Sequence, residues 1–249
     1  MTRTTIITTL FLVTVLTYSQ SISQWRGPER NGIYPETGLL AIWPDNGPEL
    51  LWSAEDIGKG YSSAVSDGKT VFVTGMKGKS DYLTALDLSG KVLWQTEFGV
   101  AWTGSFPESR CTPTVEGDNV YVLSGSGVIA CINALDGKIK WTFDGVKKFD
   151  GEYGDWGVCE SLLILDEKLF YSPAGKKTTV VALNKNTGET IWMSESLNDK
   201  SAYVSPLLIH YGNKNIVVNV LNDHLIGVDA EFGKIPGNSI TGTSALRKA

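Results

Sequence analysis

Two long segments of this 249-residue chain contain the side chains best suited to hold a ligand. The first segment contains Trp102 and Arg110, and the second contains Asp155 and Trp156. Indole rings can stack on a flat molecule, while a guanidinium or a carboxylate fixes its polar groups through charged hydrogen bonds. These residues are candidates to bind a flat polar molecule, a sugar or a peptide segment. The other interpretation, that they cap the sheets and solvate the rim, fits the same residues and remains open.

The sequence indicates no catalytic or metal-binding residue. The chain has only two histidines, His210 and His224, and none of its three cysteines forms a Cys-x-x-Cys pair. A zinc site therefore lacks its usual ligands. Asp155 and Glu160 are the first candidate oxygen ligands for calcium, but this ion usually takes six or more oxygens and no such set can be assembled.

The charge of the chain argues against nucleic acid as a partner. The formal net charge is −5, the isoelectric point is near 5.1, and no run of Lys or Arg is longer than two residues. A protein that binds a phosphate backbone needs a basic surface to attract it. We therefore expect a protein or a small polar or carbohydrate ligand.

A phrase of about twelve residues recurs along the chain and is the strongest signal in the sequence. Its copies read LTALDLSGKVLW, CINALDGKIKW and VVALNKNTGETIW, and a shortened fourth copy, LIGVDAEFGKI, begins at residue 225. A glycine precedes a tryptophan by four residues in each of the first three copies: Gly90 and Trp94, Gly137 and Trp141, Gly188 and Trp192.

The spacing of the copies matches the blades of a β-propeller. Trp52 fits as the end of a preceding copy, and the steps from there to Trp94, Trp141 and Trp192 are 42, 47 and 51 residues. Propeller repeats have periods of this size. Each copy also contains two alternating segments separated by polar turns, as in YSSAVSDGKTVFVTG from residue 61, which completes four strands per unit.

Physical chemistry explains the fixed glycine and tryptophan. A glycine can take positive φ where the chain reverses between the third and fourth strands. The indole is large enough to cover the gap between neighbouring sheets, and its N–H can donate to a backbone carbonyl. We therefore predict an all-β fold, a β-propeller of four-stranded antiparallel blades that stack because one blade cannot bury its own apolar face.

The phrase Ala-Leu-Asp-x-x-Gly-Lys-x-x-Trp is similar to the repeat of the pyrroloquinoline-quinone-like (PQQ-like) β-propellers. This family includes quinoprotein alcohol dehydrogenases and the propeller subunit of the outer-membrane protein assembly machine. The opening QWRGPERNGIYPETGLL resembles the start of exported bacterial members, and the likeness extends from about Gln24 to Lys234. The resemblance implies a ring of seven or eight blades, so the four to five available here predict an incomplete propeller.

The resemblance also implies what a dehydrogenase of this family would need. Its site would hold PQQ between adjacent cysteines and a tryptophan, with calcium held by a carboxylate and an amide beside an aspartate base. This chain has no adjacent cysteine pair, since Cys111 and Cys159 occupy matching positions of neighbouring repeats. Arg110 and Glu160 flank these positions, which places both near the central channel. PQQ with calcium is thus implied by the resemblance alone.

The two ends of the chain differ from the repeats. Residues 1–21 contain an apolar stretch from Ile6 to Leu16, too short to span a bilayer, and they predict a signal peptide cut near Ser21 or before Gln20. The product would be exported, to the periplasm or the extracellular space. Residues 22–236 form the propeller, and residues 237–249 are expected to be an irregular tail.

Three hypotheses for function remain open from the sequence. A binding or scaffolding propeller requires only the repeats, the export signal and the aromatic segments, so it is the leading hypothesis. A PQQ-dependent alcohol or sugar dehydrogenase is the first alternative. The second alternative is a truncated, non-functional fragment of a longer propeller, which the missing blades and the unusual tail would suggest.

Overall fold

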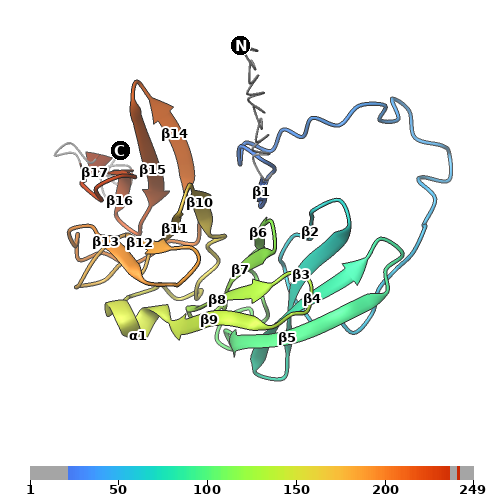
Figure 1. Ribbon diagram of the computed structural model, residues 1–249, viewed down its shortest axis with the longest axis horizontal. Helices are drawn as coiled ribbons and strands as arrows, with labels where there is room; N and C mark the ends of the chain where they lie inside the picture. The colour runs from blue at the N-terminus through green and yellow to red at the C-terminus, as the bar shows by residue number, and fades with distance from the viewer. Residues whose placement is uncertain (1–21, 236–239, 242–249) are drawn as a thin grey trace, which may run out of the picture.

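Antiparallel β-sheets account for almost all of the regular structure. The computed structural model describes residues 22–235 and 240–241, and its strands form four sheets that follow one another around an arc (Figure 1). Each sheet contains four consecutive strands of one repeat, so the predicted incomplete propeller is confirmed. The signal peptide predicted at residues 1–21 lies outside the described residues.

The first two blades cover the middle of the chain. Blade 1 contains β2 (Val65–Ser66), β3 (Thr70–Lys77), β4 (Ser80–Asp87) and β5 (Val92–Val100). Blade 2 contains β6 (Thr114–Glu116), β7 (Asn119–Leu123), β8 (Val128–Asn133) and β9 (Ile139–Asp144), and β1 (Ile22–Ser23) adds a fifth strand beside β6.

The remaining blades follow a single helical turn, α1 (Gly145–Phe149). Blade 3 contains β10 (Leu163–Leu165), β11 (Lys168–Tyr171), β12 (Val181–Asn184) and β13 (Thr190–Met193). Blade 4 contains β14 (Leu207–Tyr211), β15 (Lys214–Val220), β16 (His224–Asp229) and β17 (Ile240–Thr241). Residues 240–241 of the expected irregular tail thus pair with β16, and its other residues are not described. Within the described chain, no helix is long and apolar enough to cross a bilayer.

Neighbouring blades are joined by the contact that the repeat predicted. The indole at the outer edge of one blade lies against the glycine turn of the next, and its N–H donates to a nearby carbonyl. These hydrogen bonds run from Trp94 to Ala134 (3.2 Å), from Trp141 to Lys185 (3.1 Å) and from Trp192 to Ala230 (3.3 Å).

The turn glycine is required for two physical reasons. Gly137 and Gly188 both have φ of 72°, a conformation that L side chains rarely adopt. A Cβ on Gly137 would also lie 2.7 Å from the Trp94 ring, and one on Gly188 would lie 2.9 Å from the Trp141 ring. The glycine therefore permits both the turn and the close approach of the indole.

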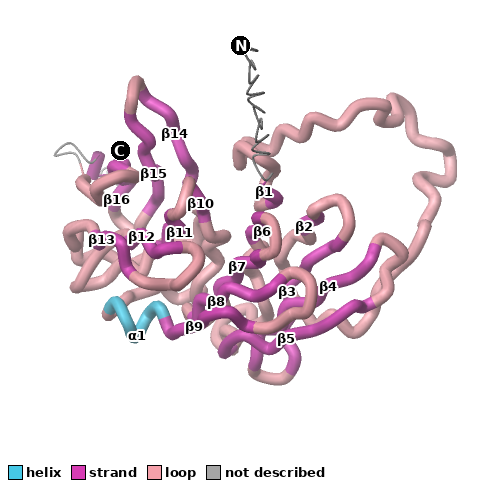
Figure 2. The backbone as a smooth tube through the Cα atoms, viewed as in Figure 1, coloured by secondary structure: helices cyan, strands magenta, loops and turns pink. Residues whose placement is uncertain are grey.

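Trp52 makes the same kind of contact without belonging to a strand. A Cβ on Gly90 would lie 2.5 Å from its ring, which corresponds to the contact between Trp94 and Gly137 one blade later. The segment between β1 and β2 that carries Trp52 is an extended loop that swings away from the sheets (Figure 2). Trp52 therefore occupies the position of a preceding blade's tryptophan, as the spacing predicted.

The N-terminal segment is anchored at the centre of the arc by a buried arginine. Arg30 is only 3% exposed, and its Nε donates to Gln24 at 2.7 Å. Its terminal nitrogens donate to the carbonyls of Ser161 (2.8 Å), Pro206 (3.1 Å) and Leu162. One side chain thus connects the segment that leads from β1 to the starts of blades 3 and 4.

Removing an inter-blade indole should weaken the stack. We expect Trp141→Ala to lower the free energy of unfolding by about 3 kcal/mol, because it leaves a cavity against Gly188 and removes a hydrogen bond. Urea unfolding followed by circular dichroism measures this. Trp43→Ala is the control, since Trp43 is 62% exposed, and its effect should stay within about 0.5 kcal/mol. Equal effects of the two substitutions would contradict the docking role.

Arg30→Met tests the central anchor. The substitution keeps the length of the side chain but leaves several buried carbonyls without a donor, so we expect a loss of about 2–4 kcal/mol. Arg26→Met is the matched control, because Arg26 is exposed. Urea unfolding and limited proteolysis near residue 30 report the difference. The anchor is disproved if both variants unfold at the same urea concentration and resist protease equally.

Candidate functional site

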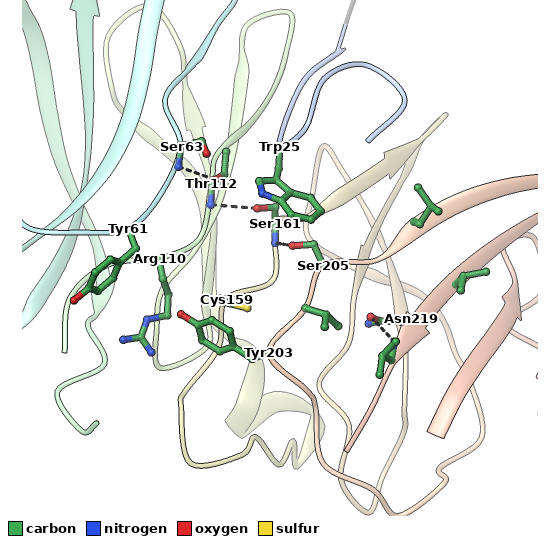
Figure 3. A pocket seen from close by; sticks show the side chains of 14 residues that line it. Trp25, Tyr61, Ser63, Arg110, Thr112, Cys159, Ser161, Tyr203, Ser205 and Asn219 are labelled. Atoms are coloured by element: carbon green, nitrogen blue, oxygen red, sulfur yellow. Dashed lines mark hydrogen bonds between the residues drawn. The ribbon is translucent and has the colours of Figure 1, made fainter. Parts of the chain in front are cut away.

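The starts of the four blades enclose a central cavity of about 520 Å³. One lining side chain comes from the same position before the first strand of each blade: Tyr61, Arg110, Cys159 and Tyr203. Figure 3 shows Arg110 between Tyr61 and Tyr203, with Cys159 behind them. Trp25, from the N-terminal segment, also lines the cavity. The central cavity is therefore assembled by the repeat itself.

Two residues further along each blade, hydroxyl side chains connect the blades in series. The backbone N–H of Ser63 donates to Thr112 Oγ1 at 3.0 Å, and that of Thr112 donates to Ser161 Oγ at 3.2 Å. The N–H of Ser161 then donates to Ser205 Oγ at 2.9 Å (Figure 3). We call these four residues the hydroxyl ladder. Because all four line the cavity, the ladder places hydroxyl groups on its wall.

The hydroxyl ladder corrects the sequence alignment of blades 2 and 3 by one residue. It pairs Thr112 with Ser161, so Arg110 corresponds to Cys159 and Cys111 corresponds to Glu160. The expectation that Cys111 and Cys159 match each other was wrong. The inner strands are short, so an alignment shifted by one residue fits the sequence almost as well as the correct one. Such a shift nevertheless exchanges buried and cavity-facing side chains.

Four aromatic residues surround the outer end of the cavity. Tyr61, Phe106, Trp156 and Tyr203 line a second space of about 350 Å³, with Arg110 as its fifth lining residue. We call these four residues the aromatic mouth. The rings of Phe106 and Trp156 are stacked, with centroids 5.8 Å apart. Because the two spaces share Tyr61, Arg110 and Tyr203, they form one continuous site.

Arg110 is the structural centre of this site. It is 6% exposed, its terminal nitrogens donate to the carbonyls of Phe106 and Trp156, and its guanidinium lies 5.6 Å from the Tyr203 ring. These bonds hold the two long loops of the sequence analysis together. Its Nε is buried without a hydrogen-bond partner. Because Nε is inaccessible, it is the second N–H of each terminal nitrogen that retains capacity for a further acceptor.

The structure separates the predicted site residues into two groups. Arg110 and Trp156 lie together in the site, whereas Trp102 lines neither of its spaces. The Trp102 indole N–H donates to the carbonyl of Ser105 at 3.0 Å, and its ring meets the Tyr153 ring edge-on. Trp102 therefore packs the first loop against the second. Asp155 lines a separate surface hollow beside Trp156.

Glu160 is buried beneath the site and already has partners. One carboxylate oxygen accepts from the backbone N–H of Ser172 at 3.0 Å, and the other accepts from its hydroxyl at 3.3 Å. Burial raises the pKa of Glu160 from 4.5 to about 8, although these hydrogen bonds and the charge of Arg30 favour the ionised form. Burial likewise lowers the pKa of Arg30 to about 10. Glu160 and Arg30 are thus a buried acid and base that act on each other through their charges.

The three cysteines are free thiols. Burial raises the pKa of Cys159 to about 12, so its sulfur is protonated at neutral pH. A nucleophilic cysteine needs a lowered pKa and a neighbouring base. Cys159 therefore contributes shape to the cavity wall, in agreement with a structural role.

The donor set of the site does not fit a calcium ion. Calcium takes six to eight oxygens, mostly from carboxylates and carbonyls. The described residues that line the site include no carboxylate, and the structure does not bring Asp155 and Glu160 together there. The described part of the chain also has no cluster of three potential metal ligands among its His, Cys, Asp and Glu side chains. No step through a quinone and calcium can be built on these residues.

Several residues of the site could not be selected from the sequence. Tyr61, Tyr203 and the hydroxyl ladder looked like ordinary strand-end residues, because single tyrosines and serines carry no distinctive spacing. An alignment of the repeats in the correct register would have found them. Each hydroxyl comes two residues after a cavity-facing side chain, in YSS, RCT, CES and YVS.

The raised pKa of Glu160 predicts a pH-dependent stability. The folded state holds this proton more tightly than the unfolded state, so the contribution of Glu160 to stability is complete below about pH 4.5 and is lost as the pH rises toward about 8. The slope can approach about 1.4 kcal/mol per pH unit. Glu160→Gln should flatten it in urea unfolding from pH 5 to 8, whereas Glu55→Gln, at an exposed position, should not. An unchanged slope in Glu160→Gln would refute the assignment.

Comparison with known proteins agrees with this architecture. Residues 37–152 match the family model described as outer membrane protein assembly factor BamB. No curated protein matches the chain. Among solved structures, BamB from Moraxella catarrhalis superposes with a TM-score of 0.50 at 20% identity, over 79% of this chain and 54% of its own.

Two dehydrogenase structures have the same fold. A europium-containing methanol dehydrogenase superposes with a TM-score of 0.53 at 15% identity, over 70% of this chain and 40% of its own. The quinohemoprotein alcohol dehydrogenase ADHIIG from Pseudomonas putida HK5 gives 0.53 at 16%, over 71% and 34%. The matched region thus spans about a third to a half of these proteins. The family match, which covers just under half of the chain, and the repeated glycine–tryptophan contacts are consistent with the repeat of the PQQ-like β-propellers.

Proposed function

We propose that this chain is an exported binding or scaffolding propeller, which holds its ligand in the central cavity and the aromatic mouth. The observation that carries the proposal is the position of Arg110, a buried cation that lines a site which all four described blades help to form. A ligand that enters this site contacts the whole repeat array at once. The export part of the proposal rests on the signal peptide expected at residues 1–21.

The exposure of the aromatic mouth supports binding. Tyr61, Phe106, Trp156 and Tyr203 are 63%, 68%, 51% and 47% exposed, although aromatic rings of this size are usually more deeply buried. Exposed apolar groups that gather in one place mark interaction sites. The rings are therefore available to a ligand without rearrangement of the blades.

The chemistry of the lining supports holding a ligand rather than transforming it. The thiol of Cys159 is protonated at neutral pH, and the nearest buried acid, Glu160, is engaged by Ser172. Neither group has the arrangement of nucleophile and adjacent base that covalent catalysis requires. The family match to an outer membrane protein assembly factor is compatible with a scaffolding role.

A pull-down from the envelope fraction of the source cells tests the proposal. The wild-type protein should retain a specific partner or ligand, and Trp156→Ala should lose most of it because half of the exposed stacking surface is removed. Trp43→Ala, which removes an exposed indole outside the site, should retain it. Both variants should unfold within about 1 kcal/mol of the wild type. Equal recovery by Trp156→Ala and Trp43→Ala would refute this site.

A further inference from the structure

We infer that the ligand of the central cavity is an acidic sugar, a uronate unit whose carboxylate binds Arg110 and whose ring stacks in the aromatic mouth. This inference rests on the proposed function and names the chemistry of its ligand. Three features of the site carry it: the charge of Arg110, the hydroxyl ladder and the aromatic mouth.

The charge of Arg110 selects an anion. It is the only charged residue among the described residues that line the site. Among the described residues, no carboxylate oxygen lies within 4.0 Å of a guanidinium nitrogen of Arg110, so Arg110 forms no ion pair. A buried cation without a contacting anion is costly, and a ligand carboxylate would compensate it through charged hydrogen bonds. A cationic ligand would be repelled, although aromatic rings alone could attract one.

Asp81 is a buried acid that acts on Arg110 through its charge, but the two side chains form no ion pair. Asp81 is fully buried, its Oδ2 accepts from the N–H of Gly125 at 2.8 Å, and its Oδ1 has no partner. Burial raises the pKa of Asp81, although the hydrogen bond from Gly125 and the charge of Arg110 favour its ionised form. The Nε of Arg110 has no partner but is itself buried. The second N–H of each terminal nitrogen is the group that can donate to an acceptor in the cavity.

The hydroxyl ladder favours a sugar over a peptide. One way in which a peptide binds is to pair its extended backbone with free N–H and C=O groups of a strand edge. The N–H groups of Ser63, Thr112 and Ser161 already donate to hydroxyls, and the edge of β6 is covered by β1. Each hydroxyl that accepts one of these bonds still has its own proton to donate. The wall therefore offers O–H donors, which suit the many oxygens of a sugar.

The aromatic mouth supplies the stacking surface that a sugar ring requires. Phe106 and Trp156 lie nearly parallel, at an interplanar angle of 28°, and both are more than half exposed. Arg110 binds the carbonyls of both residues, so the stacking surface and the cation are held at a fixed relative position. Their arrangement suits a ligand with its flat body beside its anionic group.

Isothermal titration of the full chain with two matched trisaccharides tests the inference. We expect the galacturonate trisaccharide to bind at least about tenfold more tightly than the neutral galactose trisaccharide of the same linkage, because one charged hydrogen-bonded contact distinguishes them. Arg110→Gln should abolish this preference, and Arg110→Lys should keep part of it. Increasing salt should weaken the binding of the galacturonate only.

The possible outcomes separate this inference from the proposed function. Equal binding of both sugars, or a preference unchanged in a folded Arg110→Gln variant, overturns the acidic-sugar assignment. Tighter binding of a triglutamate peptide overturns it in favour of a peptide carboxylate. If Arg110→Gln does not fold, the salt dependence in the wild type decides the question. If neither sugar binds while Trp156→Ala still loses its partner in the pull-down, this inference fails and the proposed function stands.

Discussion

The contact between a tryptophan and the glycine turn of the following blade is the interaction on which the rest of this structure depends. A single blade has an apolar face that it cannot bury alone, so its stability comes from the neighbouring blade. The indole fills the space between the outer strands, and the turn glycine leaves room for it at positive φ. Because the contact recurs from Trp52 to Trp192, the same pair of residue types joins each described blade to its neighbour.

The tryptophan–glycine contact at the outer strands of the blades also determines which residues lie together at their inner strands. Blades that are related by one recurring contact place equivalent residues around a common centre. The hydroxyl ladder then connects Ser63, Thr112, Ser161 and Ser205 through hydrogen bonds of 2.9–3.2 Å, and the residues two positions earlier form the cavity wall. The site is thus a product of the architecture, and its chemistry depends on which side chain each repeat supplies at one position.

Two arginines, Arg30 and Arg110, are buried near this cavity. Arg30 donates to backbone carbonyls of two blades and acts as a structural cation. Arg110 also donates to carbonyls, but it lines the cavity with its Nε unpaired. The same residue type therefore connects blades in one position and lines the cavity in the other. The difference lies in how completely the neighbouring backbone satisfies the guanidinium.

The sequence by itself determined the repeat, the four-stranded blades and the separate roles of the glycine and the tryptophan, because local turn chemistry and a fixed spacing specify them. It also indicated Arg110 and Trp156, through the residue types of two long loops. Only the tertiary structure decided that Trp102 supports the loops, that Glu160 is buried against Ser172 and that Tyr61 and Tyr203 complete the site. A short inner strand tolerates a slip of one residue in sequence, whereas the hydrogen bonds between blades admit one register, and that register decides which side chains face the cavity.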